Sequence, residues 1–131
     1  MSAERCVTVA VAVVLDGGRV LVGRRSPSAA DQPGRDEFPG GLVETGESPA
    51  AAAERECLEE AAVPVAAEDL LGRETVASSR GATEILFYRC RVVADTPPAA
   101  PFTWLPLADL ARLDFPAANR GVVARLLGER S

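Results

Sequence analysis

The sequence predicts an α/β fold in which helices pack against a mixed sheet, with strands making up most of the core. Segments rich in β-branched residues are mixed along the chain with segments of helix-forming residues, which is typical of helix-and-sheet sandwiches. The 131 residues suit one domain with a sizeable buried core. Because no repeat, low-complexity segment or linker interrupts the pattern, we expect residues 1–131 to form a single domain.

The N-terminal part predicts a β-hairpin followed by a loop. Residues 7–15 are apolar and β-branched, and an Asp-Gly-Gly turn at 16–18 leads into a second strand over 19–22. Residues 26–35 hold prolines and a glycine among polar residues, which indicates a loop. The Phe-Pro-Gly-Gly sequence at 38–41 then predicts a tight backbone feature leading into a short strand or turn.

A helix is predicted from Pro49 to about Ala61. Ser48 suits the N-cap and proline suits the first helical position, whereas Pro64 cannot continue a helix. A row of small residues would let this helix pack closely against the sheet. The row consists of Ala50, Ala53, Cys57 and Ala61.

The second half of the chain predicts a strand pair, a loop and two helices. The strands are expected at 71–79 and 84–93, the proline-rich loop at 95–101, a last short strand at 102–105, and the helices at 107–113 and 116–127. We expect Tyr88 and Trp104 to lie in the core.

Charge and residue types exclude several classes of function. The formal net charge of -5 argues against a broad nucleic-acid-binding surface, which needs a basic stripe, but it is compatible with a single nucleotide. The absence of histidine excludes Ser-His-Asp catalysis, Cys-His catalysis and histidine-ligated zinc. The three cysteines lack Cys-x-x-Cys spacing and are expected to be reduced and buried, as in a cytoplasmic protein, with a reactive thiol as the alternative. Residues 7–15 are too short to span a bilayer, so no membrane partner is expected.

The most informative local pattern is a cluster of glutamates at positions 56, 59 and 60 of the predicted helix. At about 100° of rotation per residue, the three side chains share one sector roughly 100° wide. Like charges three and four residues apart repel, so such a face either lies in open solvent or binds a cation. A ligand set of oxygens alone suits Mg²⁺, or Mn²⁺ in its place, rather than zinc. Gly40 and Gly41 would let the backbone approach and contribute a carbonyl.

Two further charged residues extend this pattern. Arg55 is expected to point to another side of the helix from Glu56, where it could pair with Glu47 and brace the loop against the helix. With the acidic face, this arrangement suggests metal-assisted attack of water on a phosphate, with a spare carboxylate taking the proton.

The spacing of these residues resembles the Nudix box, G-x5-E-x7-R-E-U-x-E-E-x-G-U, where U is a bulky apolar residue. Gly41, Glu47 and residues 55–60 match it at every charged position. One position departs from the pattern, because Ala62 stands where the box has its last glycine. That glycine would end the helix with a positive φ, so alanine there is expected to cost about 1 kcal/mol or to force another helix ending.

The resemblance extends to the MutT branch of this family and covers nearly the full chain, through residues 7–25, 37–41 and 115–119. It implies a Nudix-type α/β/α sandwich. It also implies Mg²⁺-dependent hydrolysis of nucleoside triphosphates, notably 8-oxo-dGTP, to the monophosphate and pyrophosphate, in sanitation of the cytoplasmic nucleotide pool. We therefore expect a nucleotide substrate, no nucleic-acid polymer as partner, and a monomer or a homodimer.

The resemblance assigns three sets of site residues. The metal ligands would be a carbonyl of Gly40 with Glu56, Glu59 and Glu60. The catalytic set would be the same three glutamates with Arg55 and Glu47. The substrate contacts would be Arg25 at the phosphates and Phe38, Arg80 and Asn119 at the base.

Several of these assignments have structural alternatives. Arg25 could be only a charged strand end, and Phe38 could be a core residue. Asn119 lies near the start of a helix, where asparagine is a favoured cap, although its amide could also donate to and accept from a purine edge.

The general base and the substrate stay open at the level of sequence. The MutT branch has a further acidic residue in the loop before its last strand, where this chain has only Asp95, so either Asp95 or a box glutamate is the base. A cytidine or 5-methylcytidine triphosphate is the alternative substrate. A nucleotide-binding protein with little turnover is the alternative function.

Overall fold

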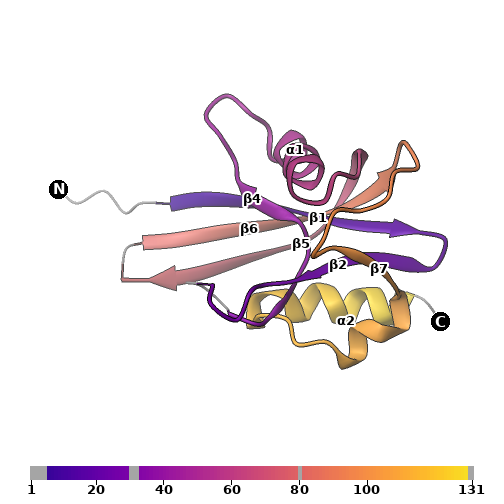
Figure 1. The fold of residues 1–131 in the computed structure, drawn as a ribbon. Coiled ribbons are helices and arrows are strands. Elements are labelled where there is room, and N and C mark those ends of the chain that lie inside the picture. Colours follow the sequence, from indigo (N-terminus) through magenta and orange to yellow (C-terminus); the bar gives the residue numbers. More distant parts are fainter. Residues whose placement is uncertain (1–5, 30–32, 80, 130–131) are drawn as a thin grey trace.

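The computed structural model describes residues 6–29, 33–79 and 81–129, in which two helices cover opposite faces of a sheet (Figure 1). Helix α1 (Pro49–Ala61) lies on one face and helix α2 (Arg120–Glu129) lies on the other. This arrangement is the predicted α/β/α sandwich, and its sheet-dominated core confirms the expected fold class.

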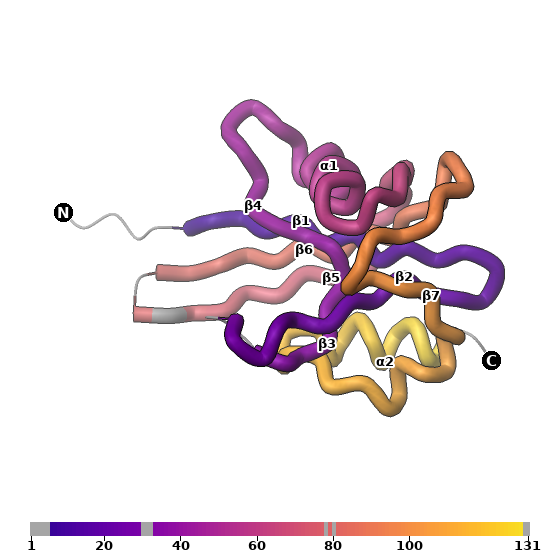
Figure 2. Tube along the Cα trace, viewed as in Figure 1, coloured from indigo at the N-terminus to yellow at the C-terminus, as the bar shows by residue number. Residues whose placement is uncertain are grey.

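Within the described residues seven strands form the sheet. They are β1 (Cys6–Asp16), β2 (Arg19–Arg24), β3 (Asp36–Glu37), β4 (Gly40–Leu42), β5 (Val65–Ser78), β6 (Gly81–Val92) and β7 (Thr103–Pro106). Their order is β3-β2-β1-β6-β5, with β4 also beside β1 and β7 beside β2 (Figure 2). β1 and β6 run parallel, whereas the other pairs among the described residues are antiparallel. The sheet is therefore mixed, as predicted.

The predicted hairpin joins β1 to β2 through a two-residue turn. Gly17 and Gly18 adopt φ values of 58° and 82°, and Asp16 pairs with Arg19. Such a turn needs positive φ at both central residues, which glycine adopts without steric cost.

The core lies on both faces of β1, because successive side chains of a strand point to opposite sides. Ala10, Ala12 and Val14 belong to the cluster of buried residues that contains α1. Val11 and Val13 belong to the cluster that contains α2. β1 therefore supports both layers of the sandwich, and the small residues on its α1 side let that helix approach closely.

The row of small residues on α1 is largely as predicted. The buried residues of the helix are Ala52, Ala53, Cys57 and Ala61. Ala50 is only half-buried, and Ala52 takes its place in the contact with the sheet.

Several predicted elements differ from the structure. The helix expected over 116–127 is divided into a 3-10 helix, η2 (Ala117–Asn119), and α2, and β6 begins at Gly81 rather than at residue 84. β5 begins at Val65 rather than at residue 71, and its start is held by the backbone N–H of Ala67, which donates to Glu54 Oε2 at 2.8 Å. The segment expected as a helix over 107–113 is a 3-10 helix, η1 (Leu107–Arg112), which ends where Leu113 becomes extended. The N–H of the next residue, Asp114, donates to the Asp36 carboxylate of β3, and its carbonyl accepts from the Asp36 N–H, so neither group is available to continue the helix.

The cysteines follow the prediction at two of three positions. Cys57 and Cys90 are buried, and burial raises the pKa of each thiol to about 12, so both are unreactive at neutral pH. Cys6 is exposed at the start of β1, so the prediction of burial was wrong there.

The two large aromatic residues outside the candidate site pack against the core. Tyr88 and Trp104 are half-buried against the α1 cluster, and the Arg19 guanidinium lies 4.3 Å from the centre of the Trp104 ring. In the part of the chain that the structure describes, neither helix combines the length and the apolar character needed to cross a membrane.

Candidate functional site

Helix α1 carries the acidic cluster, and both of its ends are fixed locally. At its start the Ala51 N–H donates to Ser48 Oγ at 3.1 Å, and Pro49 occupies the first turn, as predicted. At its end Ala62 adopts φ 61° and donates its N–H to the Leu58 carbonyl. The chain thus keeps the left-handed helix ending in spite of its alanine, so of the two expected outcomes the strained one occurs.

Two glycines of β4 lie directly beneath the acidic helix. A Cβ atom on Gly41 would overlap the Glu56 carboxyl group, and one on Gly40 would lie 2.7 Å from the Ala10 carbonyl oxygen. The glycine pair therefore lets β4 fit between β1 and α1. A side chain at either position would move the Glu56 carboxylate or separate the strands.

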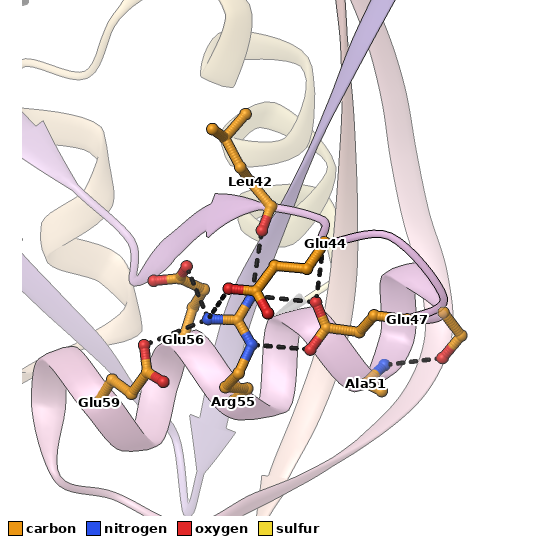
Figure 3. Close-up of polar contacts among 8 residues, drawn as sticks. Leu42, Glu44, Glu47, Ala51, Arg55, Glu56 and Glu59 are labelled. Carbon is orange, nitrogen blue, oxygen red and sulfur yellow. Dashed lines mark hydrogen bonds and ion pairs between the residues drawn. The ribbon is translucent and has the colours of Figure 1, made fainter.

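Arg55 lies at the centre of a network of charged and polar groups (Figure 3). Its guanidinium donates to Glu47 through Nε at 2.7 Å and Nη2 at 3.0 Å, and Nη2 also donates to the Leu42 carbonyl. The predicted pair with Glu47 is therefore present and joins the loop before α1 to the helix. Such a two-pronged contact is among the stronger charge-assisted hydrogen bonds.

The same guanidinium also contacts the acidic cluster, which the sequence did not predict. Arg55 Nη1 donates to Glu56 Oε2 at 3.1 Å and to Glu59 Oε1 at 3.2 Å. The expectation that Arg55 points to another side of the helix from Glu56 was wrong. The long side chain reaches Glu59 one turn ahead, so its charge lies between the loop and the acidic face.

This network sets the ionisation of Glu47. The hydrogen bonds from Arg55 lower the pKa of Glu47 to about 2, and the Glu44 backbone N–H contributes in the same direction. The acidic partners in turn raise the pKa of Arg55 above its ordinary value. Both groups stay charged across the physiological range, which keeps the loop fixed to the helix.

Glu60 has a different environment from the other two glutamates. Its Oε1 accepts a hydrogen bond from the Gly40 N–H at 3.1 Å, and burial raises its pKa, with the nearby charges of Glu56 and Glu37 acting in the same direction. Burial likewise raises the pKa of Glu37, against the opposing effect of Arg25. This corner therefore favours either a proton or an added cation.

Glu60 and Gly40 open onto a pocket of about 700 Å³, a size suited to a small ligand. Three sets of residues line it. The acidic wall consists of Glu37, Gly40 and Glu60; the sheet floor consists of Val9, Val11, Val76, Thr83 and Ile85; and the C-terminal wall consists of Pro116, Ala117, Ala118 and Asn119. Arg24, Arg25, Phe38, Pro101 and residues of the loop after β2 complete the lining.

The structure brings three of the four predicted substrate contacts into this pocket. Arg25, Phe38 and Asn119 all line it, and Arg25 Nε lies 3.2 Å from Glu37 Oε1. Phe38 is both a wall residue and a core residue, because its ring stacks on Phe115 at 4.6 Å between centroids. The fourth predicted contact, Arg80, lies outside the described residues.

Asn119 ends a short 3-10 helix, η2 (Ala117–Asn119), immediately before α2. Its backbone N–H donates to the Pro116 carbonyl. Among the described residues its side-chain amide has no hydrogen-bond partner, so no capping bond is formed and the amide is free to meet a ligand.

The acidic cluster fits a divalent cation by its donor chemistry. Carboxylates and a backbone carbonyl are the ligands that Mg²⁺ and Mn²⁺ prefer. Within the described ranges, however, no group of three or more acidic or cysteine side chains converges on one point. Instead, Glu56 and Glu59 pair with Arg55, while Glu60 accepts from the Gly40 N–H. A cation would compete with this guanidinium for the same carboxylates.

Some residues of the site were not found from the sequence. Glu37 lies in the pocket, and its neighbour Asp36 is buried and ion-paired to Arg24 at 3.2 Å. An acidic pair before the Phe-Pro-Gly-Gly segment was the available signal. Asp95, the alternative general base, is exposed and does not line the pocket.

Comparison with known proteins agrees with this geometry. The family model described as NUDIX domain matches residues 4–126. A Mycobacterium tuberculosis (strain CDC 1551 / Oshkosh) protein named "Putative 8-oxo-dGTP diphosphatase 2" is 34% identical over 126 residues, covering 90% of this chain and 86% of that protein.

Solved structures show the same fold. The crystal structure of MutT protein from Methanosarcina mazei Go1 matches with a TM-score of 0.79 at 22% identity, covering 100% of this chain and 99% of that one. A structure of MutT from a study of Aliivibrio salmonicida and Vibrio cholerae matches with a TM-score of 0.67 at 26% identity, covering 95% of this chain and 99% of that one.

Proposed function

Because the chain belongs to the NUDIX family and is a Nudix hydrolase, we propose that it cleaves a nucleoside triphosphate to the monophosphate and pyrophosphate, with 8-oxo-dGTP as its substrate. Residues 1–131 would act as one catalytic domain, as a monomer or a homodimer, on the cytoplasmic nucleotide pool. The name of the M. tuberculosis relative supports this choice of substrate.

One observation carries the proposal: Glu60 of the acidic helix lines the same pocket as Asn119, whose amide is free. Glu60 and Gly40 line one side of the pocket and Asn119 lines another. A nucleotide has charged phosphates at one end and a hydrogen-bonding base at the other. The pocket offers a suitable group for each, over a floor of aliphatic side chains.

The acidic cluster would serve the phosphate end. Glu56, Glu59 and Glu60, with the Gly40 carbonyl, would hold Mg²⁺, or Mn²⁺ in its place, at the site that Arg55 now shares. When bound, the metal would neutralise charge on the phosphates and lower the pKa of water. Arg55 and Glu47 would fix the helix against its loop, and Arg25 would meet a phosphate.

We assign the proton-accepting role to a glutamate of α1 rather than to Asp95. Glu60 lines the pocket, whereas Asp95 is exposed in the loop before β7 and contributes nothing to the lining. A general base has to lie within hydrogen-bonding reach of the attacking water, directly or through one further water.

The nucleobase of the substrate would bind between Phe38 and Asn119. Phe38 is held in place by its stack on Phe115 and offers an apolar surface. The Asn119 amide can donate and accept at once, which suits a purine edge altered by oxidation. Arg80 stays part of this proposal as a further contact to the purine.

The test is a pyrophosphate-release assay with Mg²⁺ over 8-oxo-dGTP, dGTP, CTP, dCTP, 5-methyl-dCTP and ADP-ribose, with a chelator control. We expect chelator-sensitive turnover with a preference for 8-oxo-dGTP. Preference for a cytidine nucleotide would keep the reaction and contradict the substrate. Tight nucleotide binding without turnover would contradict the reaction itself.

A further inference from the structure

Asp36 has a charged side chain that is buried in the protein. It begins β3 and is 3% exposed, the one charged residue that is buried in the described part of the chain. Phe38, two residues further along the chain, and Phe115, which follows its partner Asp114, belong to the buried cluster that contains residues of α2. Burying a carboxylate is unfavourable unless its oxygens are paired, so the partners of Asp36 indicate which parts of the structure its carboxylate joins.

Those partners join two segments that lie far apart in the sequence. The Asp114 N–H donates to Asp36 Oδ2 at 2.6 Å, and the Asp36 N–H donates to the Asp114 carbonyl at 3.0 Å. Arg24 of β2 donates to the same carboxylate through Nε at 3.3 Å. Asp36 therefore joins Asp114, two residues after η1, to the edge of the sheet.

A second tie lies beside the first. Arg35 Nη1 donates to Asp114 Oδ1 at 3.1 Å and to the Phe115 carbonyl at 3.2 Å. The Phe115 ring then stacks on Phe38. Three contacts in succession thus hold residues 114–115 against residues 35–38.

Each of the two joined segments continues into a wall of the pocket. Arg24, Glu37 and Phe38 line the pocket on one side of this junction, and the C-terminal wall, residues 116–119, begins directly after Phe115 on the other. The placement of the Asn119 amide relative to Phe38 therefore depends on the junction at Asp36.

We propose that Asp36 is a positioning residue that sets base selectivity by fixing the C-terminal wall against Phe38. The proposal rests on the proposed function, because it concerns the same pocket. In the described residues the hydrogen bonds of the Asp36 carboxylate go to Arg24 and Asp114, and none goes to the acidic wall of the pocket. Its loss should therefore change how the base is bound and leave the hydrolytic step nearly intact.

The experiment compares three variants with the wild type. Asp36→Ala removes the acceptor of the Asp114 N–H, and Asp36→Asn keeps an acceptor of the same shape while removing the charge. Asp69→Asn is the matched control, since Asp69 is exposed, pairs with Arg89 on the surface and does not line the pocket. For each we would measure kcat and KM for the preferred nucleotide and for its nearest competitor, together with thermal unfolding.

For Asp36→Ala we expect the selectivity ratio to fall about 10-fold, mainly through KM, because an unpaired N–H loosens the wall. We expect kcat to change less than about twofold. Asp36→Asn should recover most of the selectivity, and the control should behave as the wild type. Lower thermal stability with unchanged selectivity in Asp36→Ala would show a purely structural role and overturn the proposal.

A fourth variant, at a different residue of the junction, keeps the proposal testable if Asp36→Ala fails to fold. Arg35→Met removes the hydrogen bonds to Asp114 and the Phe115 carbonyl without touching the buried carboxylate. We expect the same fall in selectivity, to a smaller extent, and an unchanged ratio would overturn the proposal.

Binding separates failure of this proposal from failure of the proposed function. By calorimetry, Asp36→Ala should bind the nucleoside monophosphate product more weakly and inorganic pyrophosphate as the wild type does. If the wild type itself neither binds nor hydrolyses any nucleotide of the panel, the proposed function fails and this proposal with it. If only the effect of Asp36→Ala is missing, the proposed function stands alone.

Discussion

The acidic wall and the C-terminal wall of the pocket are built in different ways. The acidic wall and its supports come almost entirely from residues 37–60, and Arg55 reaches Glu47, Glu56 and Glu59 within that stretch. The C-terminal wall meets its support at Asp36 across 78 positions of sequence. The position of a side chain that is held by residues near it in sequence can be predicted from spacing along the chain. The position of one that is held by a distant partner depends on the whole fold.

The largest effect should come from the acidic wall. Glu59→Gln removes a proposed metal ligand from an exposed side chain, so activity should fall on the order of 1,000-fold while the fold is kept. Steady-state kinetics and circular dichroism would measure the two effects. Glu68→Gln, an exposed glutamate that pairs with Arg91, is the matched control and should be fully active. Near-normal activity of Glu59→Gln would show that this residue is not a ligand.

The support behind the acidic wall should come next. Glu47→Gln removes the negative charge that accepts two hydrogen bonds from Arg55. Loss of such an orienting partner typically lowers activity about 10- to 100-fold. Because the pKa of Glu47 is lowered to about 2 from its ordinary value of 4.5, its carboxylate stabilises the fold above pH 4.5, and this stabilisation is lost as the pH falls towards 2. Thermal unfolding of both proteins from pH 7 to pH 2 should show a difference in Tm that shrinks across that window. A constant difference would mean that Glu47 acts without its charge.

The C-terminal wall should show a smaller and more selective effect. Asn119→Ala removes the free amide, so discrimination between 8-oxo-dGTP and dGTP should fall about 10-fold while turnover of dGTP changes little. Ratios of kcat/KM measure this directly. Unchanged discrimination combined with lower stability would return Asn119 to the role of a helix residue.

The smallest effect should lie at the end of α1. Ala62→Gly relieves the positive φ of 61° and should raise the free energy of unfolding by about 1 kcal/mol with unchanged activity. Urea denaturation would detect the gain. An unchanged or lower stability would mean that the surrounding structure already compensates for the strain.

The same contrast explains what the sequence could predict. The hairpin, helix α1 with its Ser48 cap, and the pairing of Arg55 with Glu47 follow from short-range rules and are present. The contacts of Arg55 with Glu56 and Glu59 were missed, since helical angles describe Cβ directions and not the reach of a long side chain.

Features that depend on distant partners were also missed. The early start of β5 depends on Glu54 of α1, and the burial of Asp36 depends on Asp114. Neither residue differs in the sequence from an ordinary surface acid. Their partners are brought near only by the completed sheet, so the sequence does not show which acidic residues make these contacts.

The parallel pair of β1 and β6 has a consequence for the order in which the protein can assemble. β1 is synthesised well before β6, its partner along most of its length, whose paired residues run from Ala82 to Cys90. During translation the hairpin and the acidic helix can form from local contacts, while one edge of β1 stays open. The acidic cluster of α1 is therefore synthesised before the sheet is complete. The C-terminal wall is the last part of the pocket to be completed.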